Sequence, residues 1–245
     1  APEIIYNPQL KEYFLFVSYD PLMTTYNIRV GRSEKPEGPF YDFFGKDMSD
    51  TINNYPVILA PYQFNNHPGW AGTGHCGVMS TEDSRYFMAH QGRLSPRNHL
   101  MVLHVREVFF NPDGWPVVSP QRYAGDVKRQ VSEKEIVGDW ELIRIKEPVL
   151  ERQLEAGQIL WGEGDLQKEE WNFSFTLNMN ADKTTSNNGT WNFTEKEPLM
   201  SLTLGGETFN NLHVFTGHDW ENQTSTILLT GLDDEGRTVW GKRIK

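Results

Sequence analysis

The chain has 245 residues, of which 13% are aromatic, and a formal net charge of −10 at pH 7. This length allows one large all-β domain or two smaller domains, each with a buried core. The negative charge argues against nucleic acid and against a membrane surface as partners, because both attract clustered Lys and Arg. No apolar run approaches the length of a membrane span, and an internal disulfide is excluded because Cys76 is the only cysteine.

The first half of the chain is typical of antiparallel strands joined by turns. Runs of β-branched and aromatic residues over 3–6, 13–19 and 26–31 are separated by turn sequences such as NPQLKE. A second set over 77–80, 86–90 and 99–109 is separated by TEDS and GRLSPRN and closes on NPDGWP. Each set predicts a sheet of three or four strands, and two such sheets in tandem predict blades of a β-propeller.

The second half differs in character from residue 123 onward. The polar segment AGDVKRQVSEKEIV reads as a linker, so we place a domain boundary near residue 130. Alternating runs such as WELIRI, LHVFTGH and STILLTGL follow, joined by turns such as NADKTTSNNG and LDDEGR. This pattern predicts a compact β-barrel or sandwich, with one possible short helix at 150–156.

Five runs carry more specific information: APEIIYNP, YFLFVSYDPLMTTYNIRVGRSEKPEGPF, GTGHCGV, YFMAHQGR and VREVFFNPDGWPVVSPQRYAGD. In this order they resemble the fourth and fifth blades of a family 43 glycoside hydrolase, and within that family the arabinanases. The tail from about residue 130 resembles the β-barrel of the two-domain extracellular arabinanases.

This resemblance implies an all-β protein in which residues 1–130 form the last two blades of a five-bladed catalytic propeller and residues 131–245 form a C-terminal β-barrel. It also implies a secreted protein that belongs to an inverting endo-α-1,5-L-arabinanase and acts on the arabinan of plant cell-wall pectin.

The same resemblance implies that the catalytic carboxyl groups lie outside this sequence. The family's general acid is a Glu directly before an Ala-Pro or Gly-Pro pair, and here the chain opens on Ala1 and Pro2, so that Glu would precede Ala1. Glu3 has the wrong place in the pattern. The general-base Asp and the Asp that tunes the acid belong to blades one and three. Because inverting hydrolysis needs two carboxyl groups roughly 6.5–9.5 Å apart, we expect a companion chain to supply them.

His75 stands between glycines at the mouth of the predicted strand 77–80. A lone histidine is weak evidence for a metal site, and a tight turn with the ring bonded to backbone would suit the same residues. The resemblance favours a ligand, because the family's histidine at this place points into the central channel and helps to hold an ion, usually calcium. One imidazole among several waters is an unusual shell for Ca²⁺, which prefers oxygen.

Three residues are candidate substrate contacts. His90 and Arg93, in AHQGR, match a family pattern near the substrate cleft, where the planar donors of an Arg can bind sugar hydroxyls. A surface Arg at a hairpin is an equally good reading. Trp70 ends the loop PYQFNNHPGW and could stack on a pentose ring. Asp20 and its loop DPLMTTYN are further candidates for the cleft border.

The remaining histidines and tryptophans are assigned to structure. His99 and His104 are read as strand residues without chemistry. The tryptophans assigned to packing in the C-terminal barrel are Trp140, Trp161, Trp171, Trp191 and Trp240.

Two other functions stay open from the sequence. The chain could be a non-catalytic carbohydrate-binding β protein, or part of an exo-acting arabinosidase or xylosidase of the same family. Loops of the blades absent from this sequence would decide between endo and exo action.

Overall fold

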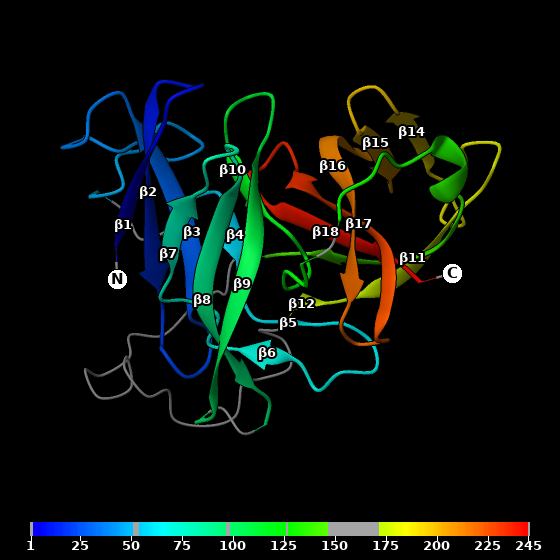
Figure 1. Cartoon of the computed structure of the whole chain (residues 1–245), viewed down its shortest axis with the longest axis horizontal. Helices are drawn as coiled ribbons and strands as arrows, with labels where there is room; N and C mark the ends of the chain where they lie inside the picture. Colours follow the sequence, from blue (N-terminus) through cyan, green and yellow to red (C-terminus); the bar gives the residue numbers. More distant parts are fainter. Residues whose placement is uncertain (1, 51–53, 97–98, 126, 147–171, 245) are drawn as a thin grey trace.

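The computed structural model describes residues 2–50, 54–96, 99–125, 127–146 and 172–244. Strands fill three sheets in this part of the chain, which confirms the predicted all-β class (Figure 1). Its one helical element is the three-residue 3-10 turn Glu133–Glu135, so no described helix has the length to cross a membrane. The possible helix at 150–156 lies outside the described residues.

The first sheet is a four-stranded antiparallel meander that corresponds to the first predicted blade. Its hairpins follow from local turn chemistry: the side-chain oxygen of Asn7 accepts hydrogen bonds from the backbone N–H groups of Gln9 and Leu10 at 3.0 and 3.1 Å, which turns the chain after the first strand. In order, the strands are β1 (Glu3–Asn7), β2 (Glu12–Tyr19), β3 (Asn27–Ser33) and β4 (Val57–Leu59).

The second sheet corresponds to the second predicted blade and has the order β10-β9-β8-β6-β5-β12, with β7 paired to β8. Its last strand comes from the C-terminal half of the chain and runs parallel to β5. The strands are β5 (Tyr62–Gln63), β6 (Trp70–Ala71), β7 (Gly77–Ser80), β8 (Tyr86–Leu94), β9 (Met101–Phe110), β10 (Pro116–Val118) and β12 (Asn172–Phe173).

The third sheet has the order β13-β11-β18-β17-β16-β15-β14 and curls around its own core. Single bridges join Met179 of β13 to Thr185 and Thr190 of β14 to Thr184, so the turn between the two end strands connects them and the curled sheet agrees with the predicted barrel or sandwich. The strands are β11 (Gly138–Arg144), β13 (Phe175–Met179), β14 (Thr190–Thr194), β15 (Leu199–Leu204), β16 (Glu207–Asp219), β17 (Thr224–Leu232) and β18 (Thr238–Arg243).

The predicted packing tryptophans that the structure describes, Trp140, Trp191 and Trp240, are all buried. Trp161 and Trp171 lie outside the described residues. Two further details differ from the sequence reading: β9 begins at Met101, so His99 lies in the preceding turn, whereas His104 is a strand residue as predicted.

One hydrophobic core joins the blades to the outside of the barrel, next to the barrel's own core. Trp240 of β18 belongs to the same buried cluster as the blade residues, and its indole N–H donates to the carbonyl oxygen of Val118 at 3.0 Å. Thr238 Oγ1 donates to the Val57 carbonyl at 2.8 Å. We call this contact between the blades and the barrel the seam, and it is packed like a protein interior. The domain boundary near residue 130 stays a prediction from the sequence.

A buried group of charges lies at this seam. The Nζ of Lys242 is 2.8 Å from Asp219 Oδ1, 2.8 Å from Glu221 Oε2 and 3.4 Å from Glu141 Oε2, and all four side chains are almost fully enclosed. Burial alone would lower the pKa of Lys242, but the carboxylates outweigh it and raise that pKa. The side chain of Gln121, from the blade half, also donates to Glu221.

Two buried histidines lie beside this seam. His90 Nδ1 is 2.7 Å from the Gln91 carbonyl oxygen, and His90 Nε2 accepts from Arg106 Nε at 3.0 Å. The ring of His104 meets Trp70 edge-on at 4.3 Å. Burial, with the charge of Arg106, lowers the pKa of His90 to about 3, and burial lowers the pKa of His104 as well. Both rings are thus neutral at pH 7.

We expect Lys242→Met to cost about 3–5 kcal/mol of unfolding free energy, because it leaves buried carboxylates without their cation. Urea unfolding at pH 7 measures the loss. The matched control, Lys46→Met at an exposed position, should change stability by no more than about 0.5 kcal/mol. A loss for Lys242→Met as small as that of the control would contradict the proposed importance of this ion cluster.

The buried histidines predict that acid destabilises the fold. Their folded pKa values lie below the ordinary 6.5, so the unfolded chain binds more protons and stability falls as the pH drops from 7 toward 4. Each histidine contributes a slope of up to about 1.4 kcal/mol per pH unit. We expect His104→Leu to reduce the slope of unfolding free energy against pH by the contribution of one histidine. Met101→Leu, on the same strand, should keep the wild-type slope. Unfolding titrations that give parallel slopes for both variants would disprove the assignment.

Candidate functional site

The segment 70–76, WAGTGHC, crosses between the two blades. On the side of the first blade, the Gly72 N–H donates to the Thr24 carbonyl at 2.7 Å, and the His75 N–H donates to Ser18 Oγ at 2.9 Å. On the side of the second blade, Gln91 Nε2 donates to the Gly72 carbonyl at 3.0 Å. The backbone of this segment is therefore fixed from both sides.

Two glycines of GTGHCG, Gly72 and Gly74, make this crossing possible. A Cβ at Gly74 would lie 2.2 Å from the ring of Tyr26, and a Cβ at Gly72 would lie 2.6 Å from the Leu22 carbonyl oxygen and 2.7 Å from Arg93 Cδ. Gly72 also has a φ of +54°. No other residue fits at these two positions without moving a neighbour, so the glycine pattern seen in the sequence reflects close packing between the blades.

His75 itself is exposed and has a φ of +56°. Few residues other than glycine adopt this left-handed conformation, although His is among those that do so more often, and such positions concentrate at functional sites. The next residue, Cys76, is buried, which raises the pKa of its thiol to about 12 and keeps it protonated. The chain thus turns one imidazole outward and the following thiol inward.

The described residues do not by themselves form a calcium site. They contain no group of three or more His, Cys, Asp or Glu side chains placed to hold a metal ion. Calcium takes six to eight ligands, mostly oxygen, whereas His75 offers a single nitrogen. Any calcium at this position would need most of its ligands from water and from groups outside the described part of the chain.

The loop DPLMTTYN packs directly against the segment 70–76, since the carbonyl of Thr24 accepts the Gly72 N–H. At the base of this loop, Asp20 Oδ2 accepts from Asn27 Nδ2 at 2.5 Å and forms an ion pair with Arg29 at 3.5 Å. The guanidinium of Arg29 is buried. Asp20 is therefore a paired carboxylate that orders the loop.

The structure separates the two candidates of AHQGR. Arg93 pairs with Ala71 across β6 and β8, and its side chain packs against Gly72, so it lies at the segment 70–76. Burial lowers the pKa of Arg93. His90 points to the other face of β8, into the seam, where both ring nitrogens have partners. In this structure His90 offers no nitrogen to a sugar.

Trp70 is also enclosed. Its ring stacks on His67 with centroids 5.1 Å apart, meets His104 edge-on, and has the guanidinium of Arg122 5.4 Å from its centroid. The ring is buried, so it has no open face for a pentose in this arrangement. It supports the start of the segment 70–76 instead.

Gln91 is the residue that sequence reasoning missed. Its side chain binds the Gly72 carbonyl, and its backbone N–H donates to the Gly74 carbonyl at 3.0 Å. It thus positions Gly72 and Gly74, which lie three residues and one residue before His75. Only its place in AHQGR, between His90 and Arg93, could have drawn attention to it.

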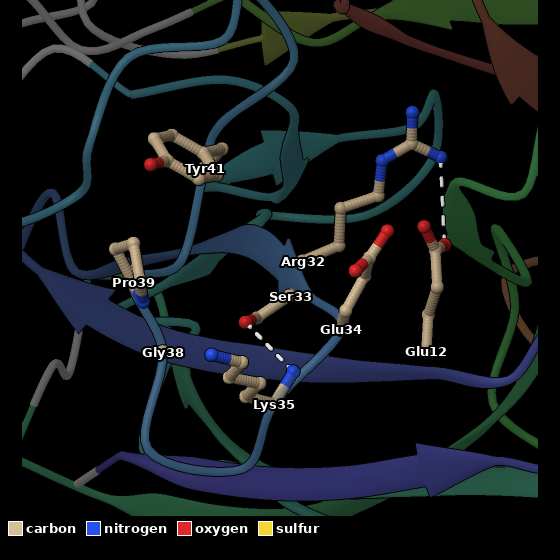
Figure 2. A pocket seen from close by; sticks show the side chains of 8 residues that line it. All are labelled: Glu12, Arg32, Ser33, Glu34, Lys35, Gly38, Pro39 and Tyr41. Carbon is tan, nitrogen blue, oxygen red and sulfur yellow. Dashed lines mark hydrogen bonds and ion pairs between the residues drawn. The ribbon is translucent and has the colours of Figure 1, made fainter.

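A hollow of about 340 Å³ lies at a different place, on the rim of the first blade (Figure 2). It opens near Glu12, at the opposite end of β2 from Ser18, so it is not part of the site around His75. Within it Arg32 is held by Glu12 at 3.6 Å and by the carbonyl of Asp113 at 3.1 Å. Its lining residues are Glu12, Arg32, Ser33, Glu34, Lys35, Gly38, Pro39 and Tyr41.

Comparisons with known proteins agree with this architecture. Residues 120–241 match the GH43_C family, described as a C-terminal lipocalin-like domain. The chain is 29% identical to extracellular endo-α-(1→5)-L-arabinanase 2 of Bacillus subtilis, over 99% of this chain and 52% of the relative. It is 27% identical to the extracellular endo-α-(1→5)-L-arabinanase of Thermotoga petrophila, over 100% of this chain and 52% of the relative. The chain therefore spans about half the length of these curated relatives.

Two solved structures have the same fold over the whole chain. The family 43 glycoside hydrolase YxiA of Bacillus licheniformis superposes with a TM-score of 0.82 and 26% identity, covering 100% of this chain and 55% of that one. The endo-1,5-α-L-arabinanase of Thermotoga petrophila in complex with TRIS gives a TM-score of 0.81 and 24% identity, covering 100% and 54%. Residues 120–241 therefore belong to the GH43_C family of C-terminal lipocalin-like domains, and the whole chain has the fold of the family 43 glycoside hydrolase YxiA.

Proposed function

We propose that this chain is the C-terminal portion of a secreted, inverting endo-α-1,5-L-arabinanase that hydrolyses the arabinan of plant cell-wall pectin. The observation that carries the proposal is the similarity to an extracellular endo-arabinanase over 99% of the chain. The structural likeness to YxiA, which spans both blades and the barrel, supports it further.

In this proposal a companion chain supplies the catalytic carboxyl groups. The relatives are about twice as long as this chain, and inverting hydrolysis needs an acid and a base on opposite sides of the sugar. Around the segment 70–76, the carboxylate of Asp20 is already bound to Asn27 and Arg29. The role of this chain is then to form one wall of the cleft.

Arg93 is a proposed substrate contact in that wall, because it lies against Gly72 and its planar group carries several fixed donors for sugar hydroxyls; like Trp70 and His90, it is buried in this structure. Trp70 and His90, proposed from the sequence as further contacts, support the same wall from inside the seam.

We further propose that His75 gives one nitrogen ligand to a calcium ion in the complete enzyme. Its exposed ring and left-handed backbone support this role. A bound divalent cation favours the ionised form of neighbouring carboxylates and so lowers their pKa values.

Mass spectrometry under denaturing conditions, followed by digestion of linear arabinan with the same sample, tests the main proposal. For protein isolated from its natural source, we expect a companion polypeptide of propeller-blade composition and short arabino-oligosaccharide products. The control is the 245-residue chain produced alone, which should leave arabinan intact. Cleavage by the chain alone, or no cleavage by the natural protein with its companion, would refute the proposal.

Calcium binding is testable apart from activity. After chelation, calorimetric titration of the companion-bound protein should show one calcium site, and His75→Ala should weaken it by about tenfold or more. His99→Ala, at an exposed turn, is the matched control and should bind as the wild type does. Equal affinities in both variants would remove His75 from the site.

A further inference from the structure

The hollow between the start of β2 and the turn that follows β3, which we call the rim hollow, lies far from the segment 70–76 (Figure 2). Glu12 begins β2 at this hollow, whereas Ser18, near the other end of β2, accepts from the His75 N–H. A strand rises by about 3.3 Å per residue, so roughly 20 Å of strand separate the two places. The rim hollow is therefore a surface feature outside the proposed wall of the cleft.

Arg32 is the fixed polar group of the rim hollow. Its Nη1 lies 3.6 Å from Glu12 Oε2 and donates to the Asp113 carbonyl at 3.1 Å, and its guanidinium lies 4.6 Å from the centroid of the Trp115 ring. These contacts come from both blades and hold the planar group in one orientation. Within the described part of the chain both polar contacts engage Nη1, which leaves Nε and Nη2 as donors for a ligand.

An exposed aromatic ring accompanies this guanidinium. Tyr41 is 46% exposed, and its backbone N–H and carbonyl form two hydrogen bonds of 2.9 Å with the carbonyl and the N–H of Arg32. This pairing fixes the two residues beside each other on adjacent segments. Figure 2 shows the Tyr41 ring on one side of the hollow and the side chains of Arg32 and Glu12 on another. An exposed ring of this kind can stack on the apolar face of a sugar.

The charges of the rim hollow suit an uncharged ligand that both donates and accepts hydrogen bonds. Its lining has two carboxylates, Glu12 and Glu34, and two cations, Arg32 and Lys35, so neither an anion nor a cation is attracted overall. Carboxylates accept from hydroxyl groups, and guanidinium and ammonium groups donate to them. The volume of about 340 Å³ lies in the range of small-molecule sites.

We propose that the rim hollow is a second carbohydrate site, which binds a neutral pentose unit of an arabinan chain outside the catalytic cleft. The sugar stacks on Tyr41, and its hydroxyl groups bond to Arg32 and to the carboxylates of Glu12 and Glu34. The inference rests on the proposed function for the identity of the sugar.

A second site at this distance serves a long substrate and not a short one. Once the polymer is held at the rim hollow, its remaining units are at a raised effective concentration near the cleft. A short oligosaccharide cannot occupy both places, because roughly 20 Å of strand lie between them. The site therefore favours binding of the polymer.

Calorimetric titration of the 245-residue chain with short linear α-1,5-arabino-oligosaccharides tests the binding. We expect Tyr41→Ala to weaken it by about tenfold or more, because the stacking surface is lost. The matched control is Tyr6→Ala, which removes a 47% exposed tyrosine of the same blade that does not line the hollow and should bind as the wild type does. Thermal unfolding shows that both variants keep the fold.

A second variant makes the test independent of Tyr41. We expect Glu34→Ala, at an exposed position, to weaken binding by about threefold or more, because a charged acceptor for sugar hydroxyls is lost. Three results would overturn the inference: no binding by the wild-type chain, equal binding by Tyr41→Ala and Tyr6→Ala, or tighter binding of an oligogalacturonide than of the neutral probe.

Kinetics of the companion-bound protein test the role of the site. Tyr41→Ala should raise KM for long linear arabinan at least about threefold more than it raises KM for short oligosaccharides, because only the polymer reaches both places. Equal changes in the two KM values would refute an anchoring role.

Failure of this inference is distinguishable from failure of the proposed function. Arabinan cleavage by the companion-bound protein, with no binding of the neutral probe by the 245-residue chain, would reject the second site and keep the proposed function. Binding of the probe that Tyr41→Ala weakens, without arabinan cleavage by the companion-bound protein, would uphold the second site and reject the proposed function.

Discussion

The barrel and the blades depend on one shared interior. Its polar centre is the ammonium of Lys242, which neutralises carboxylates that would be costly to bury alone. All four charged side chains come from the barrel half, and Gln121 of the blade half donates to Glu221, so this charge group also bonds the two halves to each other. The apolar part of the seam, with Trp240 bonded to Val118, surrounds it. The segment 70–76 is connected to this seam at its first residue, because the guanidinium of Arg122 lies over the ring of Trp70.

Local patterns in the sequence predicted local structure well. The alternation over 77–80 and 13–19 and the turn at Asn7 are properties of short stretches, and both runs became strands. Contacts between distant segments were invisible to this kind of reasoning. The pattern of AHQGR does not reveal that the face carrying His90 meets Arg106, so only the structure shows that this histidine is buried, and its role as a substrate contact stays a prediction.

The same distinction applies to the candidate site. Glycines around His75 indicated a crowded backbone, and the structure gives the reason in the ring of Tyr26 and the side chain of Arg93. Trp70 shows the opposite case, because the sequence gives its residue type but not the rings that cover it. Gln91 carried no signal of its own, although it fixes the backbone before His75. Side-chain identity was readable from the sequence, and side-chain environment was not.

The parallel pairing of β12 with β5 bears on how such proteins evolve. This strand follows β11 of the barrel along the chain, yet it extends the sheet of the second blade, and Asn172 Nδ2 donates to the Pro61 carbonyl there at 2.7 Å. A barrel joined in this way is not an interchangeable module, since replacing it would remove an edge strand and part of the core of its neighbour. Recombination at residue 130 would therefore disrupt both sides, and the two parts are expected to be inherited together.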